Sequence, residues 1–185
     1  RVSASAVTAI GCRGQTVRHL PLAGYTLQLV NGARLAELTG ITAVCDFRSR
    51  DIAAGGEGAP LVPAFHHAMF GAARRSRVIV NIGGIANITW LPARGAVTGF
   101  DCGPGNCLLD AWIRLKRRKS YDAGGTWAAS GRVIPSLLKK LLAHPFIRRR
   151  PPKSTGRDDF NLRWVKRVLS GDEQAADVQI GRAHV

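Results

Sequence analysis

Long apolar runs are missing from this sequence. The longest apolar stretches, residues 59–65 and 78–82, fall far short of the roughly 20 residues that a membrane helix needs. The first ten residues also lack an apolar segment followed by a small-residue cleavage site, so they do not resemble a secretion signal. The sequence therefore predicts a protein without a membrane partner.

Cysteine pairs are missing as well. The four cysteines form no Cys-x-x-Cys pair, and no histidine stands at the spacing of a zinc ligand; they are Cys12, Cys45, Cys102 and Cys107. This pattern argues against a disulfide framework and against a zinc site. We expect four reduced, buried thiols.

Acidic residues are few. The chain has 12 Asp and Glu against 27 Lys and Arg, which gives a net charge of +15 and an isoelectric point near 11.1. Such a balance fits a nucleic-acid-binding module, and basic clusters occur at residues 114–119, 139–140 and 148–153. These clusters are dispersed, and no RNA-recognition or zinc-finger motif accompanies them. A basic solvated surface is the favoured explanation, and nucleic-acid binding is the alternative.

The remaining composition is that of a globular protein, with 185 residues, 45% of them hydrophobic. Strand-like and helix-like segments alternate, so the fold class predicted is α/β, and no linker divides the chain into independent domains. Strands are expected at residues 6–11, 25–30, 41–47, 77–82, 86–91 and 97–101. Helices are expected at residues 33–38, 61–70, 133–142 and 160–169, and for about three turns after Gly105. Glycines and polar residues at 46–60 predict an irregular loop.

One motif carries chemistry by itself: GFDCGPGN, residues 99–106. An expected strand delivers the carboxylate of Asp101 and turns through Gly103 and Gly105 into a helix. Such a turn allows close backbone approach to a phosphate, and the carboxylate can accept a proton or hold Mg²⁺ beside phosphates. The alternative is that Asp101 caps a tight turn, and from this motif alone both remain open.

A second glycine motif, NIGGIAN at residues 81–87, places Gly83 and Gly84 between apolar strand residues. The pair suits backbone approach to a ligand. It also suits a hairpin with both glycines at positive φ, which is the favoured interpretation without further support.

Six runs of sequence, in order, resemble the anhydro-N-acetylmuramic acid kinases of the sugar kinase, heat-shock and actin superfamily. They cover nearly everything between Ile10 and Val165, and their order makes coincidence improbable. The runs are residues 10–19, 39–66, 81–89, 99–112, 121–131 and 151–162. The resemblance implies a ribonuclease H-like fold with a mixed sheet and flanking helices. It also implies a cytoplasmic enzyme of peptidoglycan recycling that forms a homodimer.

The resemblance further implies an ATP-dependent enzyme, with Mg²⁺, that opens the 1,6-anhydro ring of its amino sugar and phosphorylates O6. By analogy, Asp101 activates the water that attacks the anomeric carbon. The residues near the nucleotide phosphates would be Gly83, Gly84, Gly103, Gly105 and Asn106.

Two polar segments resemble the family's substrate side. In DFRSRD, Arg48 and Arg50 are candidates to bind a carboxylate or phosphate, or else form ion pairs with Asp46 or Asp51. In KSTGRD, the side chains that offer hydrogen-bond donors are Lys153, Ser154, Thr155 and Arg157, and the alternative is a capped turn. His66 and His67 are expected to be ordinary helix residues.

This chain also departs from the family pattern. Arg13 stands where a histidine is usual, and Glu57 where a glutamine is usual. The family's first phosphate loop and its adenosine loop are expected outside these 185 residues, so residues 1–169 are expected to span the end of an N-terminal lobe and the start of a C-terminal lobe. Residues 170–185 show no evident pattern and are expected to be a tail of artefactual origin. We expect the chain alone to have little or no kinase activity.

Overall fold

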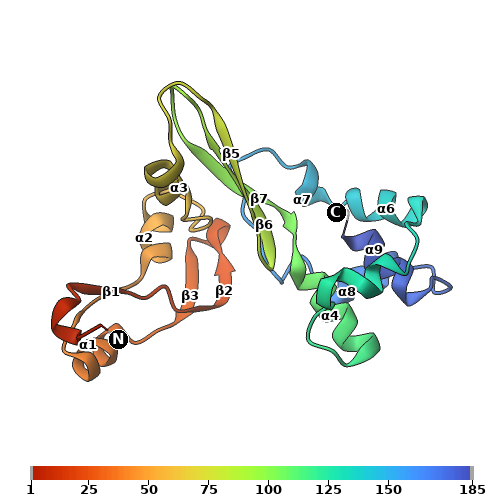
Figure 1. Cartoon of the computed structure of the whole chain (residues 1–185), viewed down its shortest axis with the longest axis horizontal. Coiled ribbons are helices and arrows are strands. Elements are labelled where there is room, and N and C mark those ends of the chain that lie inside the picture. Colours follow the sequence, from red (N-terminus) through yellow and green to blue (C-terminus); the bar gives the residue numbers. More distant parts are fainter. Residues whose placement is uncertain (1, 184–185) are drawn as a thin grey trace. The chain divides into compact units, whose positions relative to one another are not determined.

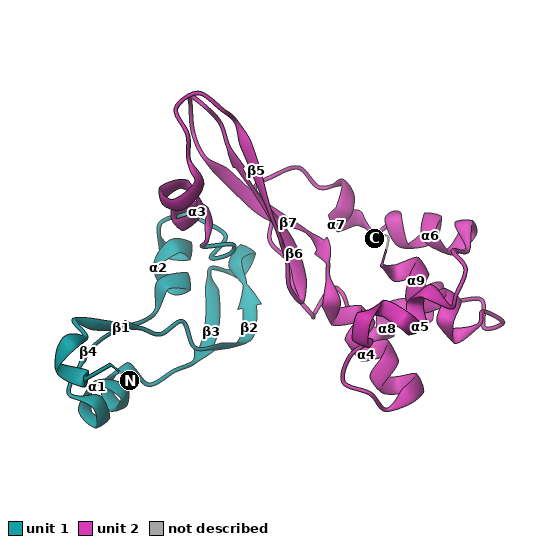
Figure 2. Cartoon of the chain, viewed as in Figure 1, with its two compact units in different colours: residues 1–61 teal, residues 62–185 magenta. Residues whose placement is uncertain are grey.

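The structure, a computed structural model, describes residues 2–183 (Figure 1). The chain forms two compact units, residues 1–61 and 62–185 (Figure 2). The boundary lies directly before helix α3 (Pro63–Phe70), with Val62 as its N-cap, so no linker reveals it in the sequence. None of the helices in residues 2–183 is both long and apolar enough to span a membrane.

Unit 1 contains two small sheets. Strands β1 (Ala9–Gly11) and β4 (Thr42–Val44) pair in parallel, while β2 (Gln15–Leu20) and β3 (Tyr25–Leu29) form an antiparallel pair. Gly24, between β2 and β3, has a φ of 77°, which a glycine adopts without steric cost. Strand β2 escaped prediction because most of its residues are exposed and its sequence does not alternate.

Two helices complete unit 1. Helix α1 (Gly32–Thr39) begins at Asn31, whose side chain accepts a hydrogen bond from the Arg34 N–H at 2.8 Å, and ends at Gly40. Helix α2 (Phe47–Ala53) lies where an irregular loop was expected, and that expectation was wrong for residues 47–53. The seven residues before the glycines are sufficient for two turns of helix, and only the glycine-rich part after Ala53 is irregular.

Unit 2 begins with α3 and a three-stranded antiparallel sheet in the order β5-β6-β7. The strands are β5 (Arg77–Ile82), β6 (Ile85–Leu91) and β7 (Thr98–Pro104), close to the predicted ranges. Helix α3 covers one face, where the His66 ring nitrogen Nδ1 and the buried Thr89 hydroxyl lie 2.8 Å apart. His66 is thus a satisfied helix residue, as predicted.

The rest of unit 2 is helical. Helix α4 follows the last strand, and the basic end of α4 leads to the short η3 and α5. The elements are α4 (Asn106–Arg117), η3 (Ala123–Gly125), α5 (Thr126–Ala129), α6 (Pro135–Leu142), α7 (Pro145–Arg148), α8 (Leu162–Val168) and α9 (Ala175–Arg182). Asp122 fixes the start of α5, because its carboxylate accepts the N–H groups of Trp127 and Ala128 at 3.0 and 2.8 Å.

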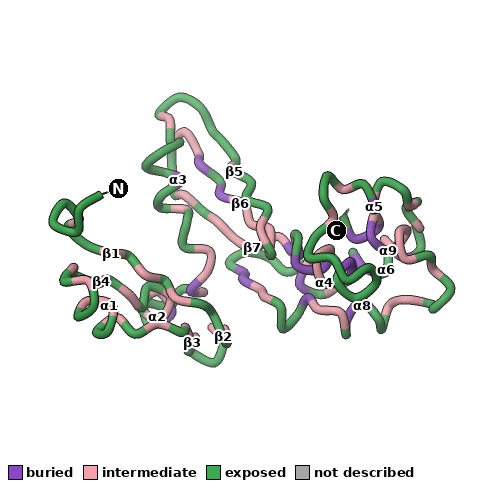
Figure 3. The backbone as a smooth tube through the Cα atoms, turned by 60° about the horizontal axis from the view of Figure 1, so that its bottom comes forward, coloured by how far each residue is buried: buried purple, intermediate pink, exposed green. Residues whose placement is uncertain are grey.

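The apolar core lies among these helices, and Figure 3 shows the buried segments gathered there. Burial of each large apolar side chain contributes about 1.5–3 kcal/mol. The core residues are Cys107, Leu108, Trp112, Ile113, Trp127, Leu137, Leu141, Phe146, Phe160, Trp164, Val165 and Val178. In unit 1, by contrast, Ile52 is the one buried apolar side chain among the described residues.

Helix α9 lies in the segment for which no pattern was expected. Val178 is buried, and the Trp112 indole N–H donates to the Ala175 carbonyl at 2.9 Å. These contacts show that residues 175–182 pack as part of the helical core. Residues 184 and 185 of the expected tail lie outside the described residues.

Candidate functional site

Asp101 lies on β7 and is only 5% exposed. Its backbone N–H donates to the Lys153 carbonyl at 3.1 Å, and its carboxylate oxygen Oδ2 accepts the Thr155 N–H at 3.0 Å. A segment more than fifty residues away in sequence therefore pairs with Asp101 through its backbone. A hydrogen bond of this kind fixes the carboxylate in one orientation.

The side chains of the KSTGRD segment are mostly held within the protein. The Lys153 ammonium donates to the Phe146 and Ile147 carbonyls, both at 3.2 Å, and lies 4.7 Å from the Phe146 ring centroid. Lys153 is 5% exposed, and these contacts compensate for the burial of its charge. The Thr155 hydroxyl donates to the Asp159 carboxylate at 2.6 Å. Lys153 and Thr155 thus anchor the segment on both sides of the buried Ser154.

A row of polar side chains crosses the sheet beside Asp101. Asn87 on β6 is the direct cross-strand partner of Asp101, and Asn81 on β5 is the partner of Asn87. Cross-strand partners place their side chains on the same face of a sheet. The side-chain oxygen Oδ1 of Asn87 is buried and has no hydrogen-bond partner among residues 2–183. The sequence carried this signal, because the two asparagines flank the glycine turn of NIGGIAN, but no role was assigned to them.

The turn between β5 and β6 lies against the start of α4. The N–H of Asn106 donates to the Gly83 carbonyl at 2.7 Å, and the N–H groups of Gly105 and Cys107 donate to the Gly84 carbonyl at 3.0 and 3.1 Å. A Cβ on Gly105 would collide with the Gly83 oxygen. The first N–H groups of the helix are therefore bonded within the chain. The predicted hairpin is confirmed, but its two glycines do not lie at positive φ.

The pKa of the Cys107 thiol, in the first turn of α4, is influenced by a positive charge. Burial raises the pKa of the Cys107 thiol, and the charge of Arg157 partly opposes this effect. Arg157 itself is exposed. The exposed Arg157 thus places a positive charge close enough to Cys107 to influence the pKa of its thiol. All four cysteines are free, as predicted, but only Cys107 is buried; the others are partly exposed.

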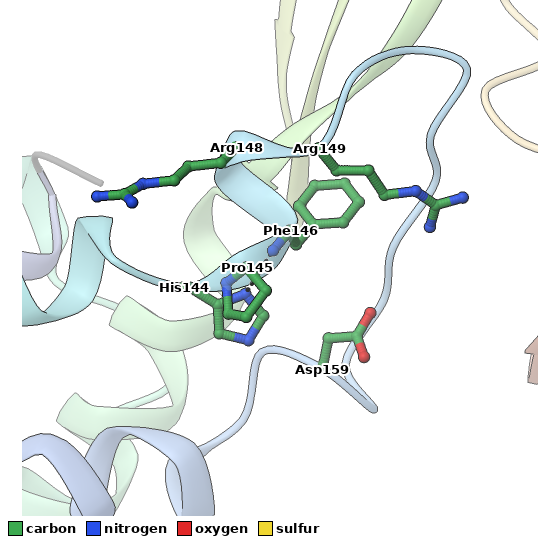
Figure 4. A pocket seen from close by; sticks show the side chains of 6 residues that line it. All are labelled: His144, Pro145, Phe146, Arg148, Arg149 and Asp159. Carbon is green, nitrogen blue, oxygen red and sulfur yellow. Dashed lines mark hydrogen bonds between the residues drawn. The ribbon is translucent and has the colours of Figure 1, made fainter.

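A depression of about 560 Å³ lies beside the same segment and is lined by residues of α7 together with Asp159 (Figure 4). Arg148 and Arg149 extend to opposite sides of α7. Asp159 connects this depression with Asp101, because its carboxylate accepts the Thr155 hydroxyl and the Thr155 N–H donates to Asp101. The lining is His144, Pro145, Phe146, Arg148, Arg149 and Asp159.

In unit 1, the two arginines of DFRSRD have different surroundings on α2. The Arg48 guanidinium donates to the Gly58 carbonyl at 2.6 Å, and the Gly58 N–H donates to the Asp51 carboxylate at 2.7 Å. Arg48 and Asp51 thus hold both backbone groups of one loop residue. Arg50 is exposed.

His19 lies beside the same loop. Burial lowers the pKa of His19, as does the charge of Arg48, while the charge and the backbone carbonyl of Glu57 raise it. The His19 nitrogen Nδ1 lies 3.0 Å from the Thr26 hydroxyl oxygen. A neutral histidine, an arginine and an aspartate therefore converge on the loop at residues 57–58.

The structure gathers one group of candidates in unit 2, around Asp101, and leaves Arg48 and Arg50 in unit 1. Within residues 2–183 there is no cluster of three or more His, Cys, Asp or Glu side chains that could hold a metal ion. The arrangement in unit 2 combines the oriented carboxylate of Asp101 with the amide oxygen of Asn87, which has no partner among the described residues, and the charge of Arg157 acts on Cys107 at the start of α4. Such a site can accept a proton from a water molecule and stabilise an anion.

Comparison with known proteins gives a consistent result. Residues 1–184 match the family model described as anhydro-N-acetylmuramic acid kinase. Proteins of that name from Nitrosomonas europaea and Nitrosospira multiformis are 61% and 59% identical to this chain over 175 residues, which is 94% of the chain and 48% of each relative. The protein of that name from Cupriavidus metallidurans is 58% identical over 97% of the chain and 50% of its own length. The chain spans about half the length of these curated relatives.

Proposed function

The chain belongs to the anhydro-N-acetylmuramic acid kinase family, and from this we propose that the complete protein is an ATP-dependent kinase of 1,6-anhydro-N-acetylmuramic acid. It opens the anhydro ring and yields N-acetylmuramic acid 6-phosphate, in the recycling of peptidoglycan in the cytoplasm. The observation that carries this proposal is the fixed carboxylate of Asp101 beside a glycine turn, within a sequence that matches the family over its whole described length.

The proposed fold of the complete protein is ribonuclease H-like. The three antiparallel strands of unit 2 would be one part of its mixed sheet. Support comes from β5, an edge strand whose residues Val78, Val80 and Ile82 are 51%, 60% and 66% exposed on one face. An apolar, unpaired edge of this kind is an aggregation hazard unless further chain covers it.

In the proposed reaction, Asp101 accepts one proton from a water molecule as the water oxygen bonds to the anomeric carbon. The bond between that carbon and O6 breaks, and O6 takes the γ-phosphoryl group of ATP, which leaves ADP. The Thr155 N–H keeps the carboxylate oriented during this step. Burial of Asp101 supports the role, since a base shielded from bulk water acts on a bound molecule.

The candidate anion ligands divide by their surroundings. Arg50 and Arg157 are exposed, and we propose that they bind the lactyl carboxylate of the sugar or the phosphate oxygens. Arg48, Lys153 and Thr155 bond to protein groups, so we propose that they shape the site.

Ser154 remains a proposed sugar ligand. Gly83, Gly84 and Gly103 are proposed to approach the phosphates through their backbone. The N–H groups of Gly105 and Asn106 bond to the β5–β6 turn, so we propose that Gly105 allows this close packing and that Asn106 reaches a phosphate through its side-chain amide.

ATP and Mg²⁺ are the proposed cofactors. Mg²⁺ in phosphoryl-transfer sites keeps several water molecules and is bound largely through the phosphate oxygens of the nucleotide, so it would arrive with ATP and would need no cluster of protein ligands in residues 2–183. When bound with ATP, it supplies neutralisation of phosphate charge. A homodimer is also proposed, from the family resemblance.

A direct assay tests this function. The complete protein, incubated with ATP, Mg²⁺ and 1,6-anhydro-N-acetylmuramic acid in H₂¹⁸O, is expected to yield a 6-phosphate with ¹⁸O at the anomeric carbon. The 185-residue chain alone is expected to give little or no product. Absence of product from the complete protein, or ¹⁸O in the phosphoryl group, would contradict the proposal.

A further inference from the structure

Asn87 is a polar residue opposite Asp101 to which the proposed reaction gives no role. Its oxygen Oδ1 is buried without a hydrogen-bond partner among the described residues. Leaving such an acceptor unpaired destabilises the folded state. Native proteins rarely carry this cost, and an exception calls for a physical reason.

The position of Asn87 supplies that reason. Its cross-strand partner is Asp101, so both side chains lie on the same face of the sheet. A register irregularity falls between Ala86 and Asn87, directly at this pair. Such irregularities often re-aim a side chain beside a functional site. Asn87 thus extends from the same face as Asp101, on a strand that is bonded on both of its edges.

We propose that Asn87 is a further catalytic residue, whose amide oxygen accepts a hydrogen bond from the water that Asp101 deprotonates. This inference rests on the proposed function. A water molecule has two O–H bonds, and Asp101 takes the proton of one. A neutral acceptor on the other fixes the direction of the lone pair that attacks the anomeric carbon, and the second hydrogen remains on the new hydroxyl group.

An amide suits this position better than a second carboxylate. Two carboxylates side by side repel, which favours protonation of one of them and would remove the base. An amide oxygen accepts the same hydrogen bond without a charge. Since the Asn87 side chain is already held in position by its strand, it needs little rearrangement during the reaction.

The test compares Asn87→Val with Thr98→Val, a polar-to-valine change at an exposed position on β7. In the complete protein, Asn87→Val is expected to lower kcat about tenfold or more, with KM for the sugar changed less than about threefold. Thr98→Val is expected to stay within about twofold of the wild type. In the 185-residue chain, Asn87→Val is expected to leave the urea midpoint unchanged or raised, because an unpaired acceptor has been removed.

Three results would overturn the inference while leaving the proposed function intact. The first is turnover of Asn87→Val within about twofold of the wild type. The second is a raised KM with unchanged kcat, which would make Asn87 a ligand of the sugar ground state. The third is that Asn87→Val destabilises the complete protein but leaves turnover per folded molecule unchanged. That result would mean that the Asn87 oxygen is hydrogen-bonded to another part of the complete protein. Lack of activity in the wild type would instead overturn the proposed function, and this inference with it.

Discussion

At the scale of single residues, several polar side chains bond to backbone groups of neighbouring segments of the chain. Lys153 bonds to the end of α7, Arg48 to Gly58, and Asp122 to the start of α5. Each such bond replaces water around a loop whose backbone would otherwise be costly to bury. Side chains that need not touch a ligand thereby hold segments of both units in place.

His144 makes one of these bonds in a way that depends on pH. Its ring nitrogen Nδ1 accepts a hydrogen bond from the Phe146 N–H at 3.3 Å. Its ring centroid lies 4.6 Å from that of Phe160 and 5.0 Å from that of Trp164. Burial lowers the pKa of His144, and the charge of Arg167 lowers it further, while that of Asp159 raises it. The folded state therefore favours the neutral ring, and a protonated Nδ1 could not accept this bond.

Stability is accordingly expected to fall with pH in the acid range. Below the unfolded pKa of about 6.5, the unfolded chain gains a proton that the folded chain resists, so stability is lost as pH falls from there toward the lower folded value. His144→Asn keeps an N-cap acceptor but does not titrate, and it is expected to flatten this loss. Thermal unfolding between pH 7 and 5 measures this loss of stability, and His19, whose pKa is also lowered by burial, contributes to the slope that remains. An unchanged slope in the variant would contradict the assignment.

At the scale of elements, the contact between the β5–β6 turn and α4 holds the glycine motifs together. A Cβ on Gly105 would meet the backbone oxygen of Gly83, which cannot move aside as a side chain can. Gly105→Ala is therefore expected to destabilise the chain by about 1–3 kcal/mol, measured by the urea midpoint. Gly156→Ala is the control, because a Cβ on Gly156 would meet nothing within 4 Å. This change is expected to alter the free energy of unfolding by no more than about 0.5 kcal/mol. Equal effects of the two changes would refute this explanation of Gly105.

Elements also show what the sequence could predict. The sequence predicted α1, α3, α4 and the sheet of unit 2, because a glycine or a proline marks the ends of these elements. Helix α2 was missed because polar and charged residues dominated its pattern, and α9 because its four buried positions include Gln179 and Arg182. Pairing of Asp101 with Thr155 was beyond prediction, since nothing local in either segment specifies a backbone contact across more than fifty residues. The orphan oxygen of Asn87 likewise appears only once the strand register is known.

At the scale of the whole molecule, apolar burial is uneven. Unit 2 holds the described core, whereas unit 1 buries Ile52 and exposes Val17, Leu27 and Leu29 at 52%, 52% and 67%. Amide exchange in the 185-residue chain is therefore expected to be faster in β2 and β3 than in α4 and α8, because local opening is easier where little apolar surface is buried. Equal protection of the two units would contradict this expectation.

The net charge of +15 also has a structural use. Lys116 lies 4.8 Å from the Trp112 ring centroid and Arg117 lies 5.0 Å from that of Trp127, so part of the basic run at the end of α4 packs on the core aromatics. The same cations stabilise the carbonyl end of the helix. Part of the basic cluster at residues 114–119 therefore packs on the protein itself.

The central claim is that Asp101 is the catalytic base of an anhydro sugar kinase, and Asp101→Asn in the complete protein tests it most directly. Asparagine retains an oxygen that can accept the Thr155 N–H, so the fold is expected to persist with an unchanged unfolding midpoint. Turnover of 1,6-anhydro-N-acetylmuramic acid is expected to fall by about 10²- to 10⁴-fold, since an amide cannot take the proton. Asp158→Asn, at an exposed position, is the matched control. Turnover of Asp101→Asn near the wild-type value would contradict the account.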